Sequence, residues 1–288
     1  MNQNSQTVRE LLLWAKRLLK ENGKESYVLD AQVLIMYVLG FNKVELILND
    51  GQIVEESKAE IYREFVKKRA AGMPLQYITG TQEFMSLDFK VNAATLIPRG
   101  DTEILVETVQ RFSKIEDIKN ILEIGTGTGC IPISLLYYDK SMRAVSADIS
   151  SKALETAKIN AELNNVTDRI VFLQSDLFEN ISDDMQEKFD AIVSNPPYIP
   201  QKTIKTLMTE VKDYEPVSAL DGGTDGLDFY RNITEQGLKY IRKGGRIFYE
   251  IGCEQAKAVS SIMQSNGMYD IEVIQDLSGL DRVVTGKK

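Results

Sequence analysis

The sequence predicts an α/β protein whose main domain is a doubly wound, mostly parallel sheet, preceded by a small all-helical domain. Three observations support this prediction. Apolar residues recur at helical spacing through residues 1–75, they alternate with polar residues through 76–97, and beyond Pro98 short apolar strands alternate with helical segments. We therefore expect a helical domain at 1–75, a β-hairpin linker at 76–97 and an α/β domain at 98–288.

Two capping patterns mark helices in the first domain. Thr7-Val8-Arg9-Glu10 has the spacing of a capping box, so a helix is expected to begin there. Ser57-Lys58-Ala59-Glu60 has the same spacing, and the helix that it predicts places Ile61 and Phe65 toward the core. The basic run Lys67-Lys68-Arg69 is expected to be a solvated face of that helix rather than a docking patch.

The linker shows the alternation of apolar and polar residues that is typical of strands. The second domain shows strands that alternate with helices. Alternation of Phe84, Leu87, Phe89 and Val91 with polar residues predicts the hairpin. Strands that alternate with helices are typical of βαβ units, which join parallel strands. Strands are expected at 120–124, 143–147, 170–174, 189–194 and 246–251, and helices at 130–138, 151–164 and 228–241.

Composition excludes several classes of function. The chain has 34 basic and 42 acidic residues, a net charge of −8, and no His, which removes mechanisms that need an imidazole base or a His-ligated metal. Cys130 and Cys253 are far apart in sequence, so neither a zinc site nor a disulfide framework is expected. No apolar run is long enough to cross a bilayer, and we expect an untargeted cytoplasmic protein with no membrane partner. The acidic balance also argues against a stable nucleic-acid partner.

A glycine-rich loop follows the first expected strand of the α/β domain. Gly125-Thr126-Gly127-Thr128-Gly129 stands where backbone can approach a ligand and the next helix can present its amino terminus. Cys130 occupies the place of the third glycine in the G-x-G-x-x-G fingerprint of dinucleotide sites. This spacing disfavours a dehydrogenase and favours a nucleoside cofactor that lacks a pyrophosphate.

Two carboxylates follow the next two strands. Asp148 stands where a carboxylate can accept hydrogen bonds from both ribose hydroxyls of such a ligand, although it could instead cap the following helix at Ser150 or Ser151. Asp176 stands where its carboxylate could accept a hydrogen bond from the exocyclic amine of adenine. The alternative is that Asp176 is an ordinary turn residue with no contact to a ligand. We favour the ligand-binding role for both.

The fourth strand delivers Asn195-Pro196-Pro197-Tyr198 to the same edge of the sheet. Two prolines remove two N–H donors and stiffen the loop, which leaves carbonyl oxygens as its exposed backbone polar groups. Asn195 adds a side-chain acceptor, and Tyr198 offers a flat face for a planar group. A planar NH₂ group fits this acceptor ledge better than the alternative, an ordinary Pro-rich turn.

The acceptor ledge suits the attack of a poor nitrogen nucleophile on an electrophilic carbon. Two acceptors on the hydrogens of an amide or aromatic amine localise electron density on its nitrogen. The proton becomes acidic as the nitrogen gains its new bond and can leave afterwards, so no strong base is needed. The lack of His is therefore compatible with this chemistry.

At this point the sequence resembles the HemK/PrmC family of release factor glutamine methyltransferases, which are class I S-adenosylmethionine-dependent enzymes. The resemblance covers essentially the whole chain and extends to its closing segment 277–282. It rests on the helical first domain and on these motifs: Ile97-Pro98-Arg99-Gly100-Asp101-Thr102-Glu103, Glu123 to Gly129, Ser194 to Tyr198, Ala219-Leu220-Asp221-Gly222-Gly223 and Asp225-Gly226-Leu227.

The resemblance implies a seven-stranded Rossmann-like sheet and a substrate, the glutamine of the Gly-Gly-Gln motif of peptide chain release factors. Catalysis would rest on Asn195, Pro196 and Tyr198, with Pro197 completing the substrate site. The helical domain would help to dock the release factor, and we expect a monomer. S-adenosyl-L-methionine would be held by Glu123, Gly125, Thr126, Gly127, Thr128, Gly129, Asp148, Asp176, Leu177 and Asn195.

Two positions depart from the family pattern. Gly100 replaces a proline, which is expected to loosen the loop and to leave Arg99 without a defined position. Leu177 stands where relatives can carry an aromatic residue, which is expected to weaken stacking on adenine.

Two alternative functions stay open. Amino methyltransferases of adenine in DNA or guanine in RNA share an Asn/Asp-Pro-Pro-aromatic loop, because their target is also a planar amine. The second alternative is a non-catalytic module that binds S-adenosylmethionine as a sensor, although such a module would not need the acceptor ledge.

Overall fold

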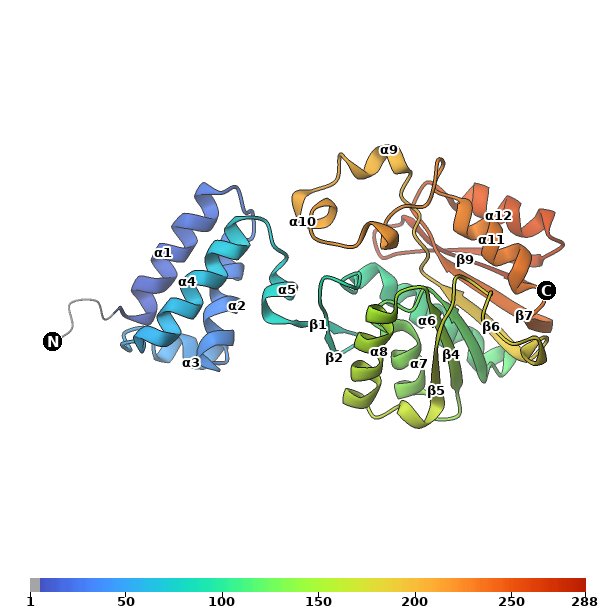
Figure 1. Ribbon diagram of the computed structural model, residues 1–288, viewed down its shortest axis with the longest axis horizontal. Helices are drawn as coiled ribbons and strands as arrows, with labels where there is room; N and C mark the ends of the chain where they lie inside the picture. Colours follow the sequence, from blue (N-terminus) through green and yellow to red (C-terminus); the bar gives the residue numbers. More distant parts are fainter. Residues whose placement is uncertain (1–5) are drawn as a thin grey trace. The chain divides into compact units, whose positions relative to one another are not determined.

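The computed structural model describes residues 6–288, which divide into two compact units (Figure 1). One unit comprises the chain up to Gly80 together with Thr209–Tyr214, and the other comprises Thr81–Met208 together with Glu215–Lys288. Among the helices of residues 6–288, none is both long enough and apolar enough to span a membrane.

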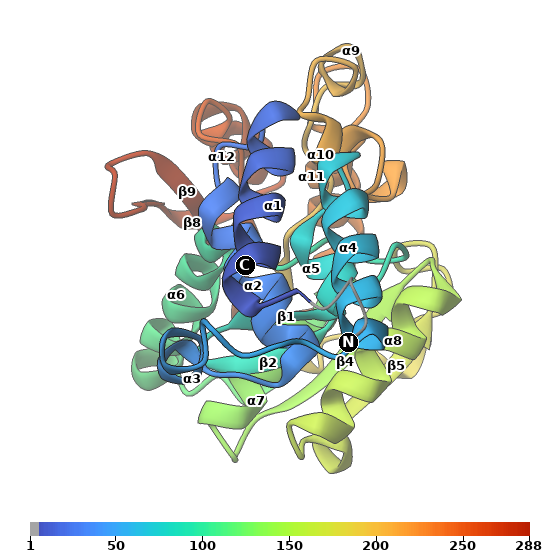
Figure 2. The same ribbon diagram turned by 90° about the vertical axis from the view of Figure 1, so that its left-hand side faces the viewer.

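The helical unit is built from α1 (Val8–Glu21), α2 (Tyr27–Leu39), α3 (Lys43–Leu48), α4 (Glu56–Ala70) and α5 (Leu75–Thr79). Helices α1, α2 and α4 pack side by side around one apolar core (Figure 2). The capping box predicted at Thr7 is confirmed, since its side chain accepts from Glu10 N and the Glu10 side chain accepts from Thr7 N. The segment α10 (Thr209–Lys212) completes this unit.

The start and the buried face of α4 differ from the prediction. The helix begins at Glu56, and the Ser57 hydroxyl donates to the Glu55 carboxylate at 2.6 Å instead of capping a helix. The buried face is formed by Ala59, Tyr62, Val66 and Arg69, whereas Ile61 is 45% exposed and Phe65 is partly buried. The prediction for Ile61 was wrong because the buried stripe runs through Tyr62, three residues after Ala59 and four before Val66, which leaves Ile61 at the edge of the helix face.

Arg69 is a buried ion-pair centre, not part of a solvated face. Its side chain is 6% exposed, and Nε lies 2.6 Å from Oδ2 of Asp30, whose side chain is 4% exposed. Nη1 lies 2.7 Å from Oε1 of Glu210 in α10. Tyr214 adds a hydrogen bond to the Ala71 carbonyl oxygen at 3.3 Å. These contacts tie residues 209–214 to the helical unit. The unit therefore consists of two segments of the chain, whereas the sequence predicted a single continuous segment.

The hairpin also differs from the predicted linker. Residues 75–79 form the helical turn α5, which ends at the left-handed Gly80, so the helical unit extends past residue 75. Strands β1 (Thr81–Phe84) and β2 (Leu87–Lys90) pair as predicted, but they belong to the second unit. Phe84 and Phe89 are buried in its core with their rings edge to face. Burial of these two rings explains why the hairpin is part of that unit rather than a free connector.

A seven-stranded sheet organises the second unit, in the order β5-β4-β3-β6-β7-β9-β8. The first five strands in this order are parallel, and β9 is antiparallel to both of its neighbours. The predicted fold class is confirmed. The strands are β3 (Asn120–Ile124), β4 (Arg143–Asp148), β5 (Ile170–Gln174), β6 (Phe189–Ser194), β7 (Ile241–Glu250), β8 (Tyr269–Gln275) and β9 (Asp281–Lys287).

Helices cover both faces of this sheet (Figure 1). One face packs on α6 (Gly100–Glu116) and α7 (Cys130–Tyr138), with α8 (Ser151–Leu163) beside them, and the other on α11 (Asp228–Gly237) and α12 (Ala256–Ser265). Helix α11 ends at Gly237 rather than at 241, because Tyr240 O accepts from Phe189 N and Ile241 starts β7. A short helix, α9 (Gln201–Ile204), follows β6.

We expect Arg69→Met to lower the free energy of unfolding of the helical unit by about 3–5 kcal/mol, because it leaves the buried Asp30 carboxylate without its cationic partner. Urea denaturation followed by circular dichroism measures this loss. Lys68→Ala is the matched control in the same basic run, since Lys68 is exposed and its contacts, with Glu64 one helical turn away and with the Phe65 ring, are at the surface. The control should change stability by about 0.5 kcal/mol or less, and an equal loss in both variants would contradict the assignment of Arg69.

Candidate active site

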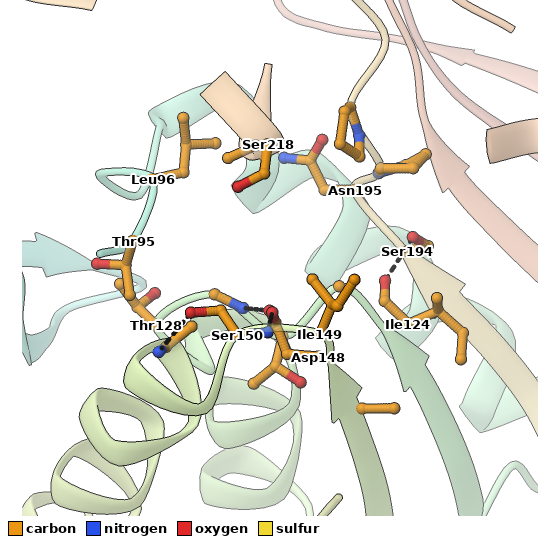
Figure 3. Close-up of a pocket in the computed structure, with 18 of the residues that line it drawn as sticks. Thr95, Leu96, Ile124, Thr128, Asp148, Ile149, Ser150, Ser194, Asn195 and Ser218 are labelled. Carbon is orange, nitrogen blue, oxygen red and sulfur yellow. Dashed lines mark hydrogen bonds between the residues drawn. The ribbon is translucent and has the colours of Figure 1, made fainter. Parts of the chain in front are cut away.

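A cavity of about 330 Å³ opens at the carboxyl ends of β3, β4, β5 and β6 (Figure 3). Its size lies within the range of small-molecule sites. Most of the predicted site residues line it. These are Gly125, Thr126, Gly127, Thr128, Asp148, Asp176, Leu177, Asn195, Pro196 and Pro197. Glu123, Gly129 and Tyr198 do not line it.

The glycine loop adopts the backbone for which glycine is needed. Gly125 and Gly127 have φ angles of 85° and 55°, and a Cβ at either position would meet no atom within 4 Å. Backbone at these glycines can therefore come close to a ligand in the cavity. Gly129 serves packing instead, since its Cβ would lie 2.8 Å from Ile133 Cδ1 and 3.2 Å from Ala157 Cβ.

Asp148 supports the glycine loop and the turn before α8, but it does not itself cap that helix. Oδ2 accepts from Gly127 N and Oδ1 accepts from Ser150 N, both at 2.8 Å. Ser150 itself caps α8, because its hydroxyl accepts from Ala153 N. Burial raises the pKa of Asp148, and the two backbone N–H groups oppose that rise. The carboxylate thus holds the glycine loop and still lines the cavity, as Figure 3 shows.

Glu123 lies beneath the loop. Its side chain is buried and accepts a hydrogen bond from Ser146, whose hydroxyl lies 2.8 Å from that of Thr126. Its Oε1 atom has no hydrogen-bond partner. Burial raises the pKa of Glu123, and the charge of Asp148 raises it further. Glu123 therefore supports the glycine loop from below and does not line the cavity.

Asp176 and Leu177 form the rim of the cavity after β5. Asp176 is exposed and its carbonyl oxygen accepts from Glu179 N, as in a turn. Leu177 is half-buried with a φ of 48°, a left-handed conformation that is costly for a leucine. This backbone places an apolar side chain and a carboxylate at the same rim.

The acceptor ledge, Asn195 to Tyr198, leaves β6 opposite Asp148. Ser194 fixes its base, because the hydroxyl donates to the Ile124 carbonyl oxygen at 2.6 Å. Asn195 Nδ2 donates to Thr102 Oγ1 at 3.3 Å. Tyr198 is half-buried beside the core, and burial raises its pKa to about 12.

The segment 219–226 supports the acceptor ledge from behind. Ile199 N donates to Leu220 O at 3.0 Å and Gly222 N donates to Ile199 O at 2.9 Å. A Cβ at Gly226 would lie 2.4 Å from the Tyr198 carbonyl oxygen, so backbone here approaches backbone directly. Gln255 Nε2 also donates to that oxygen at 3.0 Å. The glycines of this motif are therefore required for close packing against the ledge.

Several polar residues of the site had no role in the sequence-based prediction. Arg99 Nη2 donates to both carboxylate oxygens of the buried Glu215, at 2.7 and 2.8 Å. Arg99 therefore has a defined position, contrary to the expectation from Gly100, which simply begins α6. Thr102 lines the cavity from the same helix, and Glu250 lies buried at the end of β7. A charged residue at the end of an otherwise apolar stretch of strand is the signal that could have identified Glu250.

The residues of the cavity fit a nucleoside that carries a cationic amino-acid group. Asp148 and Asp176 offer acceptors for hydroxyl and amine donors, and Ile124, Ala147 and Phe229 provide apolar surface. The unpartnered Oε1 of the buried Glu123 adds a further acceptor below the glycine loop. S-adenosylmethionine has this combination of groups.

Two family models match the chain, the PrmC N-terminal domain over residues 10–80 and the methyltransferase small domain over residues 97–212. The release factor glutamine methyltransferase of Clostridium acetobutylicum is 43% identical over 96% of this chain and 97% of its own length. That of Geobacter sulfurreducens is 40% identical over 98% of this chain and 96% of its own length.

Solved structures show the same fold. The hMettl16 catalytic domain, solved with a 3′UTR hairpin, has a TM-score of 0.56 at 14% identity and covers 82% of this chain and 84% of its own. A methyltransferase from Pyrococcus furiosus has a TM-score of 0.51 at 18% identity, over 71% of this chain and 90% of its own. Near-complete coverage by relatives at 40% identity or more, together with the ledge and the cavity, shows that this chain belongs to the release factor glutamine methyltransferase family.

Proposed function

We propose that this chain methylates the side-chain amide nitrogen of the glutamine in the Gly-Gly-Gln motif of peptide chain release factors. The methyl donor that the family implies is S-adenosyl-L-methionine. The observation that carries the proposal is the acceptor ledge at the mouth of a nucleoside-sized cavity, where Asn195 and Pro196 both line the space. The names of the full-length relatives support the choice of substrate.

Different residues of the cavity would bind different parts of the cofactor. Gly125 to Thr128 would face its methionine part, with Gly129 holding the loop against α8 and the unpartnered Oε1 of Glu123 below it, and Asp148 would accept from the ribose hydroxyls. Asp176 and Leu177 would hold the adenine at the rim. When bound, S-adenosylmethionine supplies an electrophilic methyl group on a positively charged sulfur.

The acceptor ledge would prepare the nitrogen for transfer. Asn195 Oδ1 and the Pro196 carbonyl oxygen would accept the two amide hydrogens, and Tyr198 would pack against the amide plane. Two acceptors on one NH₂ group draw electron density onto nitrogen and orient it toward the methyl group. As the new N–C bond forms and the S–C bond breaks, the nitrogen loses one proton to solvent, so the absence of His is no obstacle.

The helical unit would dock the release factor. Val44, Ile47 and Leu48 of α3 are 63%, 74% and 76% exposed, which gives that helix an apolar outer surface. We also propose that the enzyme acts as a monomer in the cytoplasm.

Transfer of labelled methyl groups tests the proposed function. Purified release factor should be labelled, and release factor whose Gly-Gly-Gln glutamine is changed to alanine should not be. Label on duplex DNA or ribosomal RNA would instead assign the enzyme to the nucleic-acid methyltransferases. Cofactor binding without any transfer would favour a sensor.

We expect Asn195→Ala to lower kcat about 10²–10³-fold, because it removes one of the two acceptors that act on the amide. The dissociation constant for S-adenosylmethionine, measured by calorimetry, should change little. Asn232→Ala, the same exchange at an exposed position of α11, is the control and should keep wild-type activity. Full activity of Asn195→Ala would exclude the ledge mechanism.

We expect Asp148→Ala to weaken S-adenosylmethionine binding about 10- to 100-fold, because it removes a charged acceptor and one support of the glycine loop. At saturating cofactor, kcat should stay near the wild-type value. Calorimetry and steady-state kinetics measure the two effects, with the exposed Asp168→Ala as control. An unchanged dissociation constant would remove Asp148 from the cofactor site.

A further inference from the structure

Glu250 is a buried carboxylate next to Asn195 that the proposed reaction does not yet use. The parallel register of β6 and β7 places Ser194 opposite Tyr249, so the next residues lie side by side, Asn195 just after β6 and Glu250 at the end of β7. Glu250 is 2% exposed. A carboxylate in such a place is costly unless its surroundings use the charge.

The Glu250 carboxylate and the Asn195 amide share one hydrogen-bond network. The side chains of Thr102 and Asn195 face the Glu250 carboxylate, and hydrogen bonding from each of them lowers its pKa. Asn195 Nδ2 also lies 3.3 Å from Thr102 Oγ1. The second carboxylate oxygen, Oε2, has no hydrogen-bond partner. Nδ2 of Asn195 therefore lies beside Thr102 Oγ1 and on the side of the Glu250 carboxylate.

An asparagine amide can turn by 180° and exchange its donor and acceptor ends, and only its partners fix which end faces outward. An ionised carboxylate accepts and never donates, so it selects the Nδ2 end. We propose that Glu250 is a positioning residue that holds Nδ2 of Asn195 toward the protein and thereby leaves Oδ1 to accept from the substrate amide. This inference rests on the role proposed above for Asn195.

The groups that face Glu250 tune its charge. Burial is the largest cause of the rise in the pKa of Glu250 to about 7, and the negative charge of Asp101 also raises it. Hydrogen bonding by Thr102, the positive charge of Arg282 and hydrogen bonding by Asn195 lower it. Arg282 comes from β9 and also pairs with Asp101 and Asp276.

Two tyrosines complete these surroundings. The charge of Glu250 raises the pKa of the Tyr198 hydroxyl. The Tyr230 hydroxyl donates a hydrogen bond to the backbone carbonyl oxygen of Glu250 at 2.9 Å. The titrating group near neutral pH is therefore Glu250, since burial raises the pKa of both hydroxyls above their ordinary value.

Protonation should disturb the orientation of Asn195. A neutral carboxyl group can donate, so the amide can turn and present Nδ2 to the substrate. Since the ionised form is the active one, kcat at saturating cofactor should fall as the pH decreases through about 7.

Glu250→Gln tests the proposal because it keeps the size of the side chain and removes only its ionisable carboxyl group. It should lower kcat about 10- to 100-fold, remove the decrease of kcat near pH 7, and leave the dissociation constant for S-adenosylmethionine within about twofold of wild type. Glu235→Gln, at an exposed position of α11, is the matched control and should keep the wild-type pH profile. A Glu250→Gln enzyme with wild-type kcat and pH profile would overturn the proposal.

A double-mutant cycle separates positioning from an independent role. If Glu250 acts through Asn195, Glu250→Gln should cost nothing further in an Asn195→Ala enzyme. A second loss of the same size in that background would overturn the proposal.

The NH₂ resonance of Asn195, assigned as the signal absent from Asn195→Asp, gives a readout independent of activity. Its chemical shift should titrate near pH 7 in the wild type and not in Glu250→Gln. A chemical shift with the same pH dependence in the wild type and in Glu250→Gln would overturn the positioning role. If the wild type fails to methylate release factor, the proposed function fails, while this titration still decides the role of Glu250.

Discussion

Parallel pairing of β4, β3, β6 and β7 brings the residues that follow these strands to one edge of the sheet, and the rest of the site depends on this pairing. The register places the glycine loop beside Asp148 and Asn195 beside Glu250 at this edge, although these residues are spread over more than a hundred residues of sequence. Strands of β-branched and other apolar residues, buried on both faces, make this register costly to shift.

Rigidity of the acceptor ledge comes from two sources that act together. Pro196 and Pro197 restrict the loop from within and remove its donors. From behind, Gly222 and Gly226 let a second loop approach so closely that a methyl group would collide with the ledge backbone, and Gln255 holds the Tyr198 carbonyl oxygen. An acceptor that orients an amide must itself be held, and here the backbone is held on both sides.

Buried carboxylates give the site its electrostatic character. Burial raises the pKa of Glu123, Asp148 and Glu250, which shows that each is held in surroundings that disfavour its charge. A cationic cofactor would relieve that cost for Glu123 and Asp148, whereas Arg282 and the hydrogen bonds of Thr102 and Asn195 do so for Glu250. The same negative surroundings agree with the acidic composition of the chain and with a protein rather than a nucleic-acid substrate.

The sequence by itself determined the alternation of strands and helices, the glycine loop and the acceptor ledge, because these depend on local periodicity and on residues with special backbone properties. It also identified Asp148, whose place directly after a strand is a local feature. Tertiary structure decided the rest. The pairing of Arg69 with Asp30 and Glu210, the support of the ledge by residues 219–226, and the position of Glu250 beside Asn195 all join segments far apart in sequence. Such contacts follow from strand order and packing, which no local pattern encodes.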